Sequence, residues 1–511
     1  MKKHRENAVR GVNSIEMGAE KQCSKYVSLA LMIMLSLSTQ VLGVAKSSVV
    51  AGIFGATQQM DAYNFANSFL TFLFSIITAA VPTIIIPCYV KKKESSKAIN
   101  GFITIIYGCM ILIAGSMVCL RKPIITAITN RGNEFTSLVC EVLLILTFAH
   151  CFGAVNNITM AFFQSQGKYN LPKLVNLIVQ LLVVGFLLAC RKISILDYTW
   201  IVAAGIMLGF ALDLYFAFRC GWRYLPTLAL RDPEIVRMIQ SFLPIMLSTS
   251  VYQLSLMTDS LLTERLEEGM LTILVYASQI SAIVNSVVLG NLQVYIYPRV
   301  IRNIQAHNSQ KLFWKQSEAL HCIVWLVIAG FLVVGREGIS ILFEHGAFSS
   351  KAADMVYWGA GIYILGQQFN VIRDMIYKYF YANGNTKVPS RNSIVVSINN
   401  IVISLILMSL IGFYGVILGT VCASGLSLLM ILCRFKKNYG FEIKVRSIFF
   451  AYGKNAASGV TTTVIMLLLK EYLMINNDII AVLVYGFITI VLYSAFQRIL
   501  NKGIIEAFKA I

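Results

Sequence analysis

The chain has 511 residues, of which 57% are hydrophobic and 13% are charged, and its mean hydropathy is +0.71. A soluble domain carries about twice that share of charge, so the composition excludes a water-soluble protein and indicates a chain buried largely in a bilayer. The net charge of +19 comes from Lys and Arg in short segments between apolar runs. That pattern indicates loops beside anionic membrane lipids and no nucleic-acid groove.

The N-terminal segment, residues 1–26, is basic and leads into an apolar run that continues to Gly55. A signal peptide has an apolar region of only about 7–15 residues, so we expect a cytoplasmic tail followed by a retained first helix. The 11 Cys are scattered and form no CxxC pair. The sequence therefore predicts neither disulfides nor a metal site, and no cofactor.

Apolar runs long enough to span the hydrocarbon core, about 20 residues each, predict an all-α polytopic protein of about 14 transmembrane helices. The expected helices are residues 27–54, 61–90, 98–120, 134–163, 172–190, 196–219, 236–264, 270–298, 313–335, 352–380, 389–411, 413–434, 449–470 and 478–498. They divide into an N-lobe at 27–219, a cytoplasmic linker at 220–235, a C-lobe at 236–434, a final pair of helices within 449–498 and a cytoplasmic tail at 499–511.

The distribution of Lys and Arg predicts the orientation of these helices. If the N-terminus lies inside and the helices alternate, 31 of the 43 Lys and Arg fall in inner segments and nine in outer loops. Positive residues are retained on the cytoplasmic side, so we expect a multi-pass protein of the bacterial cytoplasmic membrane with both termini inside.

Three sequence patterns recur at nearly one offset. Phe163-x-x-x-Gly167-x-x-x-x-Pro172 returns as Phe380-x-x-x-Gly384-x-x-x-x-Pro389, and the Ile-Ala-Gly run that begins at 113 returns at 328. Residues around Met34–Ser48 match those around Met246–Ser260. Each repeat holds six helices, an even number, so both copies enter the membrane in the same direction. This predicts two lobes related by a pseudo-two-fold axis along the membrane normal, a geometry that suits alternating access; a rigid scaffold without transport is the alternative.

Charged and polar side chains inside the predicted helices mark candidate sites, because such groups are costly within the bilayer. Lys46 and Asp259 fall at equivalent places in the repeat, which suggests a phosphate site in one lobe and a cation site in the other. The structural alternatives are that Lys46 reaches the headgroups and that Asp259 bonds a neighbouring helix. Asn399 and Asn400 offer oxygen ligands for Na⁺ or simple interhelical hydrogen bonds. Asp61 stands where it caps a helix.

The run Thr39–Lys46, followed by Ile53–Ala56 and Asp61-Ala62-Tyr63, resembles the opening of the MurJ (MviN) family. The second half agrees at Leu243-Pro244, Tyr276-Ala277, Leu342-Phe343 and Phe380–Pro389. The family belongs to the multidrug, oligosaccharidyl-lipid and polysaccharide export superfamily. The resemblance implies 14 helices, a flippase activity, and a groove for the lipid tail at the last two helices.

The same resemblance implies that Gln40, Lys46, Asp61 and Gln279 line the substrate cavity. The chain departs from the family there, because Gln40, Lys46 and Gln279 stand where the family has arginine, and Phe74-Ser75 replaces an arginine pair. Lysine does not copy the planar fork with which arginine holds a pyrophosphate. The sugar headgroup is therefore left open.

These observations favour a flippase that moves an undecaprenyl-pyrophosphate-linked saccharide, lipid II or a related polysaccharide repeat unit, from the inner to the outer leaflet. The alternatives are a cation-coupled multidrug-type exporter and a non-transporting scaffold of a polysaccharide-synthesis complex. No catalytic constellation indicates an enzyme. We expect a monomer that binds an undecaprenyl-linked glycolipid, meets cell-envelope synthesis proteins, and uses a Na⁺ or H⁺ gradient.

Overall fold

A computed structural model describes residues 31–32, 34–91, 95–190, 192–227, 232–286, 309–440, 445–501 and 503–509. Regular structure within these ranges is helical throughout. Twelve of the described helices are long and apolar enough to cross a membrane. The chain is a multi-pass membrane protein.

The N-terminal half begins with a first helix, Met34–Phe54. It continues with α2 (Gln58–Thr78), α3 (Val81–Lys91), α4 (Ser96–Ile128), α5 (Gly132–Ser165), α6 (Asn170–Ala189) and α7 (Ile195–Arg219). The second half contains α8 (Pro233–Glu264), α9 (Met270–Val284), α11 (Ser309–Phe343), α12 (Ser350–Ala382), α13 (Lys387–Ile411) and α14 (Phe413–Tyr439). The chain then forms α15 (Val445–Leu473), α16 (Asp478–Leu500) and α17 (Ile504–Lys509).

Each of the predicted spans coincides with a helix, and two of them fall outside the twelve apolar candidates. One is α9, whose predicted continuation to 298 lies beyond the described residues. The other is α12, which has 33 residues but carries charged groups such as Arg373 and Asp374 within its last turns. Of the two, α12 is long enough to cross the hydrocarbon core, whereas the described part of α9 has 15 residues.

Predicted boundaries differ from the observed ones in places. The span expected at 61–90 is present as Gln58–Val90, with a turn between α2 and α3, where Pro82 has no N–H for the preceding helix but suits the first turn of a new one. The helices α4 and α11 run on to Ile128 and Phe343, past the predicted ends at 120 and 335. The predicted tail at 499–511 contains α17, which packs on α11.

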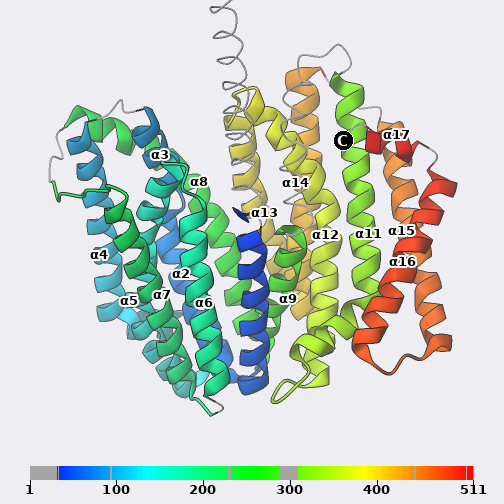
Figure 1. Cartoon of the computed structure of the whole chain (residues 1–511), viewed down its shortest axis with the longest axis horizontal. Coiled ribbons are helices and arrows are strands. Elements are labelled where there is room, and N and C mark those ends of the chain that lie inside the picture. Colours follow the sequence, from blue (N-terminus) through cyan, green and yellow to red (C-terminus); the bar gives the residue numbers. More distant parts are fainter. Residues whose placement is uncertain are drawn as a thin grey trace, which may run out of the picture.

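Two lobes lie side by side (Figure 1): α2 to α7 form one, and α9 with α11 to α14 form the other. The pairs α4–α5, α5–α7 and α6–α7 in the first lobe correspond to α11–α12, α12–α14 and α13–α14 in the second. The helix α8 packs against both α2 and α13 and so joins the lobes. This arrangement agrees with the predicted repeat.

The repeated Phe-Gly-Pro pattern forms the same helix end in both lobes. Lys168 N donates to Phe163 O (2.9 Å) after α5, and Asn385 N donates to Phe380 O (3.0 Å) after α12. These bonds require a left-handed residue, and Gly167 (φ +70) and Gly384 (φ +73) supply it. Both phenylalanines are buried. The repeated sequence pattern therefore gives α5 and α12 the same C-terminal turn.

The helices α15 and α16 dock on α11 through buried polar side chains. Asn455 Nδ2 donates to Glu318 O (3.2 Å), and its Oδ1 accepts from Gln497 Nε2 (3.1 Å) and Asn501 Nδ2 (3.2 Å). Tyr493 Oη donates to Cys322 O (2.7 Å). Such bonds fix helix pairs where the hydrophobic effect cannot distinguish partners. The last two spans are thus attached to the second lobe (Figure 1).

Candidate functional site

The two lobes meet at one end of the molecule through a close backbone approach, which we call the lobe junction: residues 52–61, Arg131, 264–272 and 344–348. Ala347 N donates to Gly52 O at 2.8 Å. Gly346 has φ +62, and a Cβ there would lie 2.2 Å from Gly52 O. A Cβ on Gly269 (φ +82) would lie 2.5 Å from Ala56 O. Only glycine permits this approach.

Asp61 is the buried centre of the lobe junction, with 0% of its surface exposed. Its Oδ2 accepts from Arg131 Nη1 (2.8 Å) and Gly269 N (2.8 Å), and its Oδ1 accepts from Thr272 N (2.9 Å) and Thr272 Oγ1 (2.8 Å). Both carboxylate oxygens are saturated. In this state Asp61 holds α2 against the start of α9.

Arg131, the residue before α5, extends the same network. Its Nη2 donates to Leu266 O (2.9 Å) and Glu267 O (2.7 Å). Its Nε lies 3.9 Å from the buried carboxylate of Glu264. Sequence reasoning assigned Arg131 to an outer loop and missed this role, because the pairing with Asp61 spans 70 residues and leaves no local signal.

The loop that carries Gly346 and Ala347 is braced by Arg336. The guanidinium donates to Asp354 Oδ1 (2.5 Å), Glu344 Oε2 (2.7 Å) and Ser350 Oγ (3.0 Å). The hydrogen bond from Arg336 lowers the pKa of Glu344 from its ordinary value. This exposed cluster therefore positions one side of the lobe junction.

Two of the predicted cavity residues lie between the first helix and α9. Ser286 Oγ donates to Gln40 Oε1 (2.7 Å), and Ser47 Oγ donates to Gln279 Oε1 (2.9 Å). These are bonds between the lobes, and they use neutral groups where the family pattern would place arginine. Each bond supplies one donor to the amide oxygen of its glutamine.

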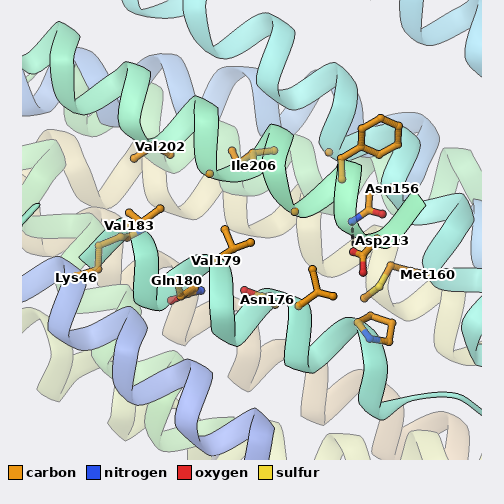
Figure 2. Close-up of a pocket in the computed structure, with 16 residues that line it drawn as sticks. Lys46, Asn156, Met160, Asn176, Val179, Gln180, Val183, Val202, Ile206 and Asp213 are labelled. Carbon is orange, nitrogen blue, oxygen red and sulfur yellow. Dashed lines mark hydrogen bonds between the residues drawn. The ribbon is translucent and has the colours of Figure 1, made fainter. Parts of the chain in front are cut away.

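Lys46 lines a cavity of about 240 Å³ inside the first lobe, enclosed by the first helix, α5, α6 and α7. Figure 2 shows Lys46 at one end of this cavity and Asp213 with Asn156 at the other, with Gln180 and Asn176 between them. Lys46 forms no hydrogen bond or ion pair with the described residues. We call this space the N-lobe cavity. Gln40, Asp61 and Gln279 are not among the residues that line it.

Asp259 lies 5% exposed among α8, α13 and α14. Its Oδ2 accepts from Thr420 Oγ1 (3.1 Å) and Asn400 Nδ2 (3.5 Å), while its Oδ1 is buried with no partner among the described groups. Asn400 also bonds Ser255 Oγ (2.7 Å) and Ser404 Oγ (3.2 Å). Asn400 therefore joins Asp259 as predicted.

The Thr420 hydroxyl contacts Oδ2 of Asp259, and the hydroxyls of Ser255 and Ser404 bond the neighbouring Asn400. Hydroxyl and carboxylate oxygens are ligands that hard cations prefer. Asn399, the other predicted ligand, forms no hydrogen bond to this cluster among the described residues, because adjacent residues on a helix point in different directions. Within the described ranges no group of three His, Cys, Asp or Glu assembles. A transition-metal centre is thus not indicated there.

A larger cavity, of about 720 Å³, lies between α11, α12, α14 and α15. Its lining is mostly apolar, with Lys436 and His321 as the ionisable members: Trp314, His321, Gln368, Phe369, Ile372, Leu428, Leu429, Leu432, Cys433, Lys436, Tyr452, Gly453 and Ala456. We call it the α11–α15 groove. Its shape and lining suit an acyl or isoprenoid chain.

Comparison with known sequences gives consistent matches along nearly the whole chain. The sequence model of a family described as "Lipid II flippase MurJ" matches residues 50–493. A "Probable lipid II flippase MurJ" of Rickettsia prowazekii is 22% identical over 469 residues, covering 86% of this chain and 90% of that protein. The protein of the same description from Thermotoga maritima is 23% identical over 476 residues, with 90% and 94% covered.

Solved structures show the same fold. One described as "Lipid II flippase MurJ, inward closed conformation" aligns with a TM-score of 0.78 at 21% identity, covering 93% of this chain and 100% of that chain. An inward-facing multidrug resistance MATE family transporter aligns with a TM-score of 0.61 at 14% identity, covering 80% of this chain and 99% of the other. The 14-helix arrangement gives the fuller match.

Proposed function

Because this chain belongs to the lipid II flippase MurJ family, we propose that it moves lipid II, or a closely related undecaprenyl-pyrophosphate saccharide, from the inner to the outer leaflet. The main support for this proposal is the membership in that family. The curated relatives that match most of its length carry that name. The activity would place the protein in peptidoglycan synthesis, with a lipid-linked glycolipid as its substrate.

The lobe junction supports alternating access as the mechanism. Polar and backbone contacts close the two lobes at the Gly55 end of the molecule. The excess of Lys and Arg on the opposite side supports an orientation with the Gly55 end at the outer face and both termini inside. The described state is then sealed toward the outside, and transport requires Asp61 and Arg131 of the first lobe to separate from residues 266–272.

The α11–α15 groove supports a long-chain substrate. Its apolar walls offer a path for the undecaprenyl chain, and Lys436 on α14 adds a positive charge near its lining. The attachment of α15 and α16 to α11 builds one wall of the groove. A 12-helix exporter has no counterpart of this pair, which disfavours the multidrug reading.

Lys46 is our candidate for the pyrophosphate. It is a cation at membrane depth without a counter-charge among its described contacts, which is expensive unless a ligand or water compensates it. A single ammonium would bind phosphate as a point charge rather than through a bidentate fork. The headgroup would therefore be held more loosely than in relatives with arginine.

Asp259 is our candidate for a coupling cation, with Na⁺ as the ion. One buried oxygen of Asp259 has no partner among the described groups, and Thr420 donates to the other. Ser255 and Ser404 bond Asn400 beside it and add hydroxyl oxygens to the cluster. Binding there would drive transport if the affinity differs between the inward-open and outward-open states. The gradient would then supply the energy that the chain cannot draw from a nucleotide.

The test is reconstitution in vesicles with fluorescent lipid II and a membrane-impermeant quencher outside. The wild type should expose the label at a rate that depends on protein, and Lys46→Ala should abolish this exposure. Arg219→Ala, which removes an exposed arginine that bonds only Tyr215 in the described structure, is the control. If protein-free vesicles exposed the label at the same rate, or if the protein exported cationic drugs without exposing lipid II, the proposed flippase activity would be wrong.

A further inference from the structure

The N-lobe cavity contains a buried carboxylate that the proposed transport does not use. Asp213 on α7 is 4% exposed. Its Oδ2 accepts one hydrogen bond, from Asn156 Nδ2 at 2.8 Å. Its Oδ1 is buried without a partner among the described groups. A charged carboxylate with one donor inside a membrane protein is costly.

Asp213 lines the N-lobe cavity, which is large enough to hold water. Its volume of about 240 Å³ is well above the roughly 10–15 Å³ that one water needs. Gln180 adds a second buried oxygen, Oε1, that has no partner among the described groups. Asn176 and Gln180 are one helical turn apart on α6 and lie between Asp213 and Lys46 in Figure 2. Polar groups thus follow the length of the cavity.

We propose that Asp213 is a proton-binding site of the first lobe, separate from the cation site at Asp259. Protonated water in the cavity gives its proton to Oδ1 of Asp213, which leaves neutral water and a neutral carboxylic acid. When the acid is deprotonated, its O–H bond breaks and the proton returns to water. The O–H of the acid then donates to water in the cavity. The ligand is H⁺ alone, and no other reactant is consumed.

The surroundings favour a proton over a metal cation. The residues that line the N-lobe cavity include no Ser or Thr. Asn156 points its amide N–H₂ at Asp213, and its Oδ1 accepts from Thr159 instead. Asn400 presents its N–H₂ to Asp259 in the same way. The difference is that Asp259 also accepts from the Thr420 hydroxyl, and Ser255 and Ser404 bond Asn400 beside it. A metal ion at Asp213 would find one carboxylate oxygen and few further ligands.

The charged groups around Asp213 are few. Lys46 from the first helix shares the cavity, and the lining residues of α5 and α6 are uncharged. Lys173 at the start of α6 bonds Ser36 of the first helix, and Arg219 on α7 bonds Tyr215. Lys46 would repel a second cation, whereas loss of the proton leaves Asp213 and Lys46 with opposite charges. Protonation therefore changes the electrostatics of the whole cavity.

Infrared spectroscopy of the purified protein tests the site without any transport assay. The wild type should show a carboxylic acid C=O band that disappears as the pH rises, and Asp213→Asn should lose it. Asp259→Asn is the matched control, because it removes the other partly unpartnered buried aspartate and should keep the Asp213 band. A full band in Asp213→Asn would overturn the proposal.

If Asp213→Asn does not fold, Asp213→Glu keeps a carboxyl group and still decides the question. With aspartate labelled by heavy carbon, the wild-type band shifts in frequency, and in Asp213→Glu the titrating band should lose this shift. An unchanged isotope shift would assign the band to another aspartate and overturn the proposal.

The link to transport rests on the proposed function and has its own measurement. In vesicles with a pH gradient, Asp213→Asn should lose the response of lipid II exposure to the gradient, while the control Arg219→Ala should keep it. Exposure that responds to pH equally in Asp213→Asn and wild type would reject the coupling. Absence of exposure in every protein would reject the flippase and leave the infrared result standing.

Discussion

Asp61 and Asp259 are both buried carboxylates, at 0% and 5% exposure, but their surroundings differ sharply. Asp61 accepts four hydrogen bonds, including one from the guanidinium of Arg131. Asp259 accepts two from neutral groups at 3.1 and 3.5 Å, and one of its oxygens accepts none from the described residues. One carboxylate is satisfied by the protein and the other is left incomplete.

The difference teaches how to separate a closing contact from an ion site. A buried charge that the fold fully pairs holds two segments together, and its cost is compensated where it stands. A buried charge that the fold leaves half-paired needs an ion or a proton to complete it. Asp213 belongs with Asp259 by this criterion, although its neighbours favour a different ion.

The largest expected effect is at the lobe junction. Arg131→Ala leaves Asp61 and Glu264 as buried charges without their cation, and breaking such a pair typically costs about 3–5 kcal/mol. The free energy of unfolding in detergent should fall by this amount. Arg219→Ala, an exposed position, should stay within about 0.5 kcal/mol of wild type.

The same variant should also open the lobe junction. Leu271 is buried beside Thr272, so Leu271→Cys in a background without other cysteines should resist a water-soluble thiol reagent. Labelling should rise by about tenfold when Arg131→Ala is added, which corresponds to about 1.4 kcal/mol. Unchanged labelling together with unchanged stability would show that Asp61 is held by its neutral donors alone.

The next effect comes from the backbone approach beside Asp61. Gly346→Ala places a Cβ 2.2 Å from Gly52 O, so it combines left-handed strain of about 1–2 kcal/mol with overpacking of about 1–3 kcal/mol. Gly384→Ala is the matched control, because it has similar φ and open space around its Cβ. The unfolding free energy should fall further in Gly346→Ala, and equal losses would remove the steric role of the lobe junction.

Asp259→Asn should behave in the opposite way to Arg131→Ala. It removes an incompletely paired charge, so the free energy of unfolding without Na⁺ should change little. Wild type should gain about 2.7 kcal/mol at a Na⁺ concentration one hundred times its dissociation constant, and Asp259→Asn should gain nothing. Thermal unfolding with Na⁺ or with choline measures this gain. Asp354→Asn, at an exposed ion pair, should keep it.

Much of the fold was predictable from the sequence because apolar length and Lys/Arg position reflect the bilayer directly. The repeat was also predictable, since Gly167 and Gly384 are required by the same helix ending. The ends of helices were less predictable. The apolar run at 61–90 gives no sign of the turn before Pro82, and α4 continues past the charged residues Arg121 and Lys122.

The candidate site was only partly predictable for a physical reason. The free-energy cost of a charge within the bilayer singles out Lys46 and Asp259 from the sequence. It does not show which neighbouring groups pair with that charge in the fold. The pairing of Asp61 with Arg131 and the grouping of Asp213 with Asn156 depend on tertiary contacts between helices. Asp213 could have been singled out by the same argument as Asp259, since both are lone acids inside apolar runs.

The smallest expected effect tests the exposed brace of the lobe junction. The hydrogen bond from Arg336 lowers the pKa of Glu344, so the folded state prefers the charged carboxylate more than the unfolded chain does, whose value is about 4.3. The resulting stability is present above that value and is lost as the pH falls through the lower, folded pKa. For a partly exposed pair it amounts to at most about 1 kcal/mol. Glu344→Gln should therefore be slightly less stable than wild type at neutral pH, and thermal unfolding should show this gap closing in acid. A gap that widens in acid would mean that Glu344 opposes, rather than supports, the loop that carries Gly346 and Ala347.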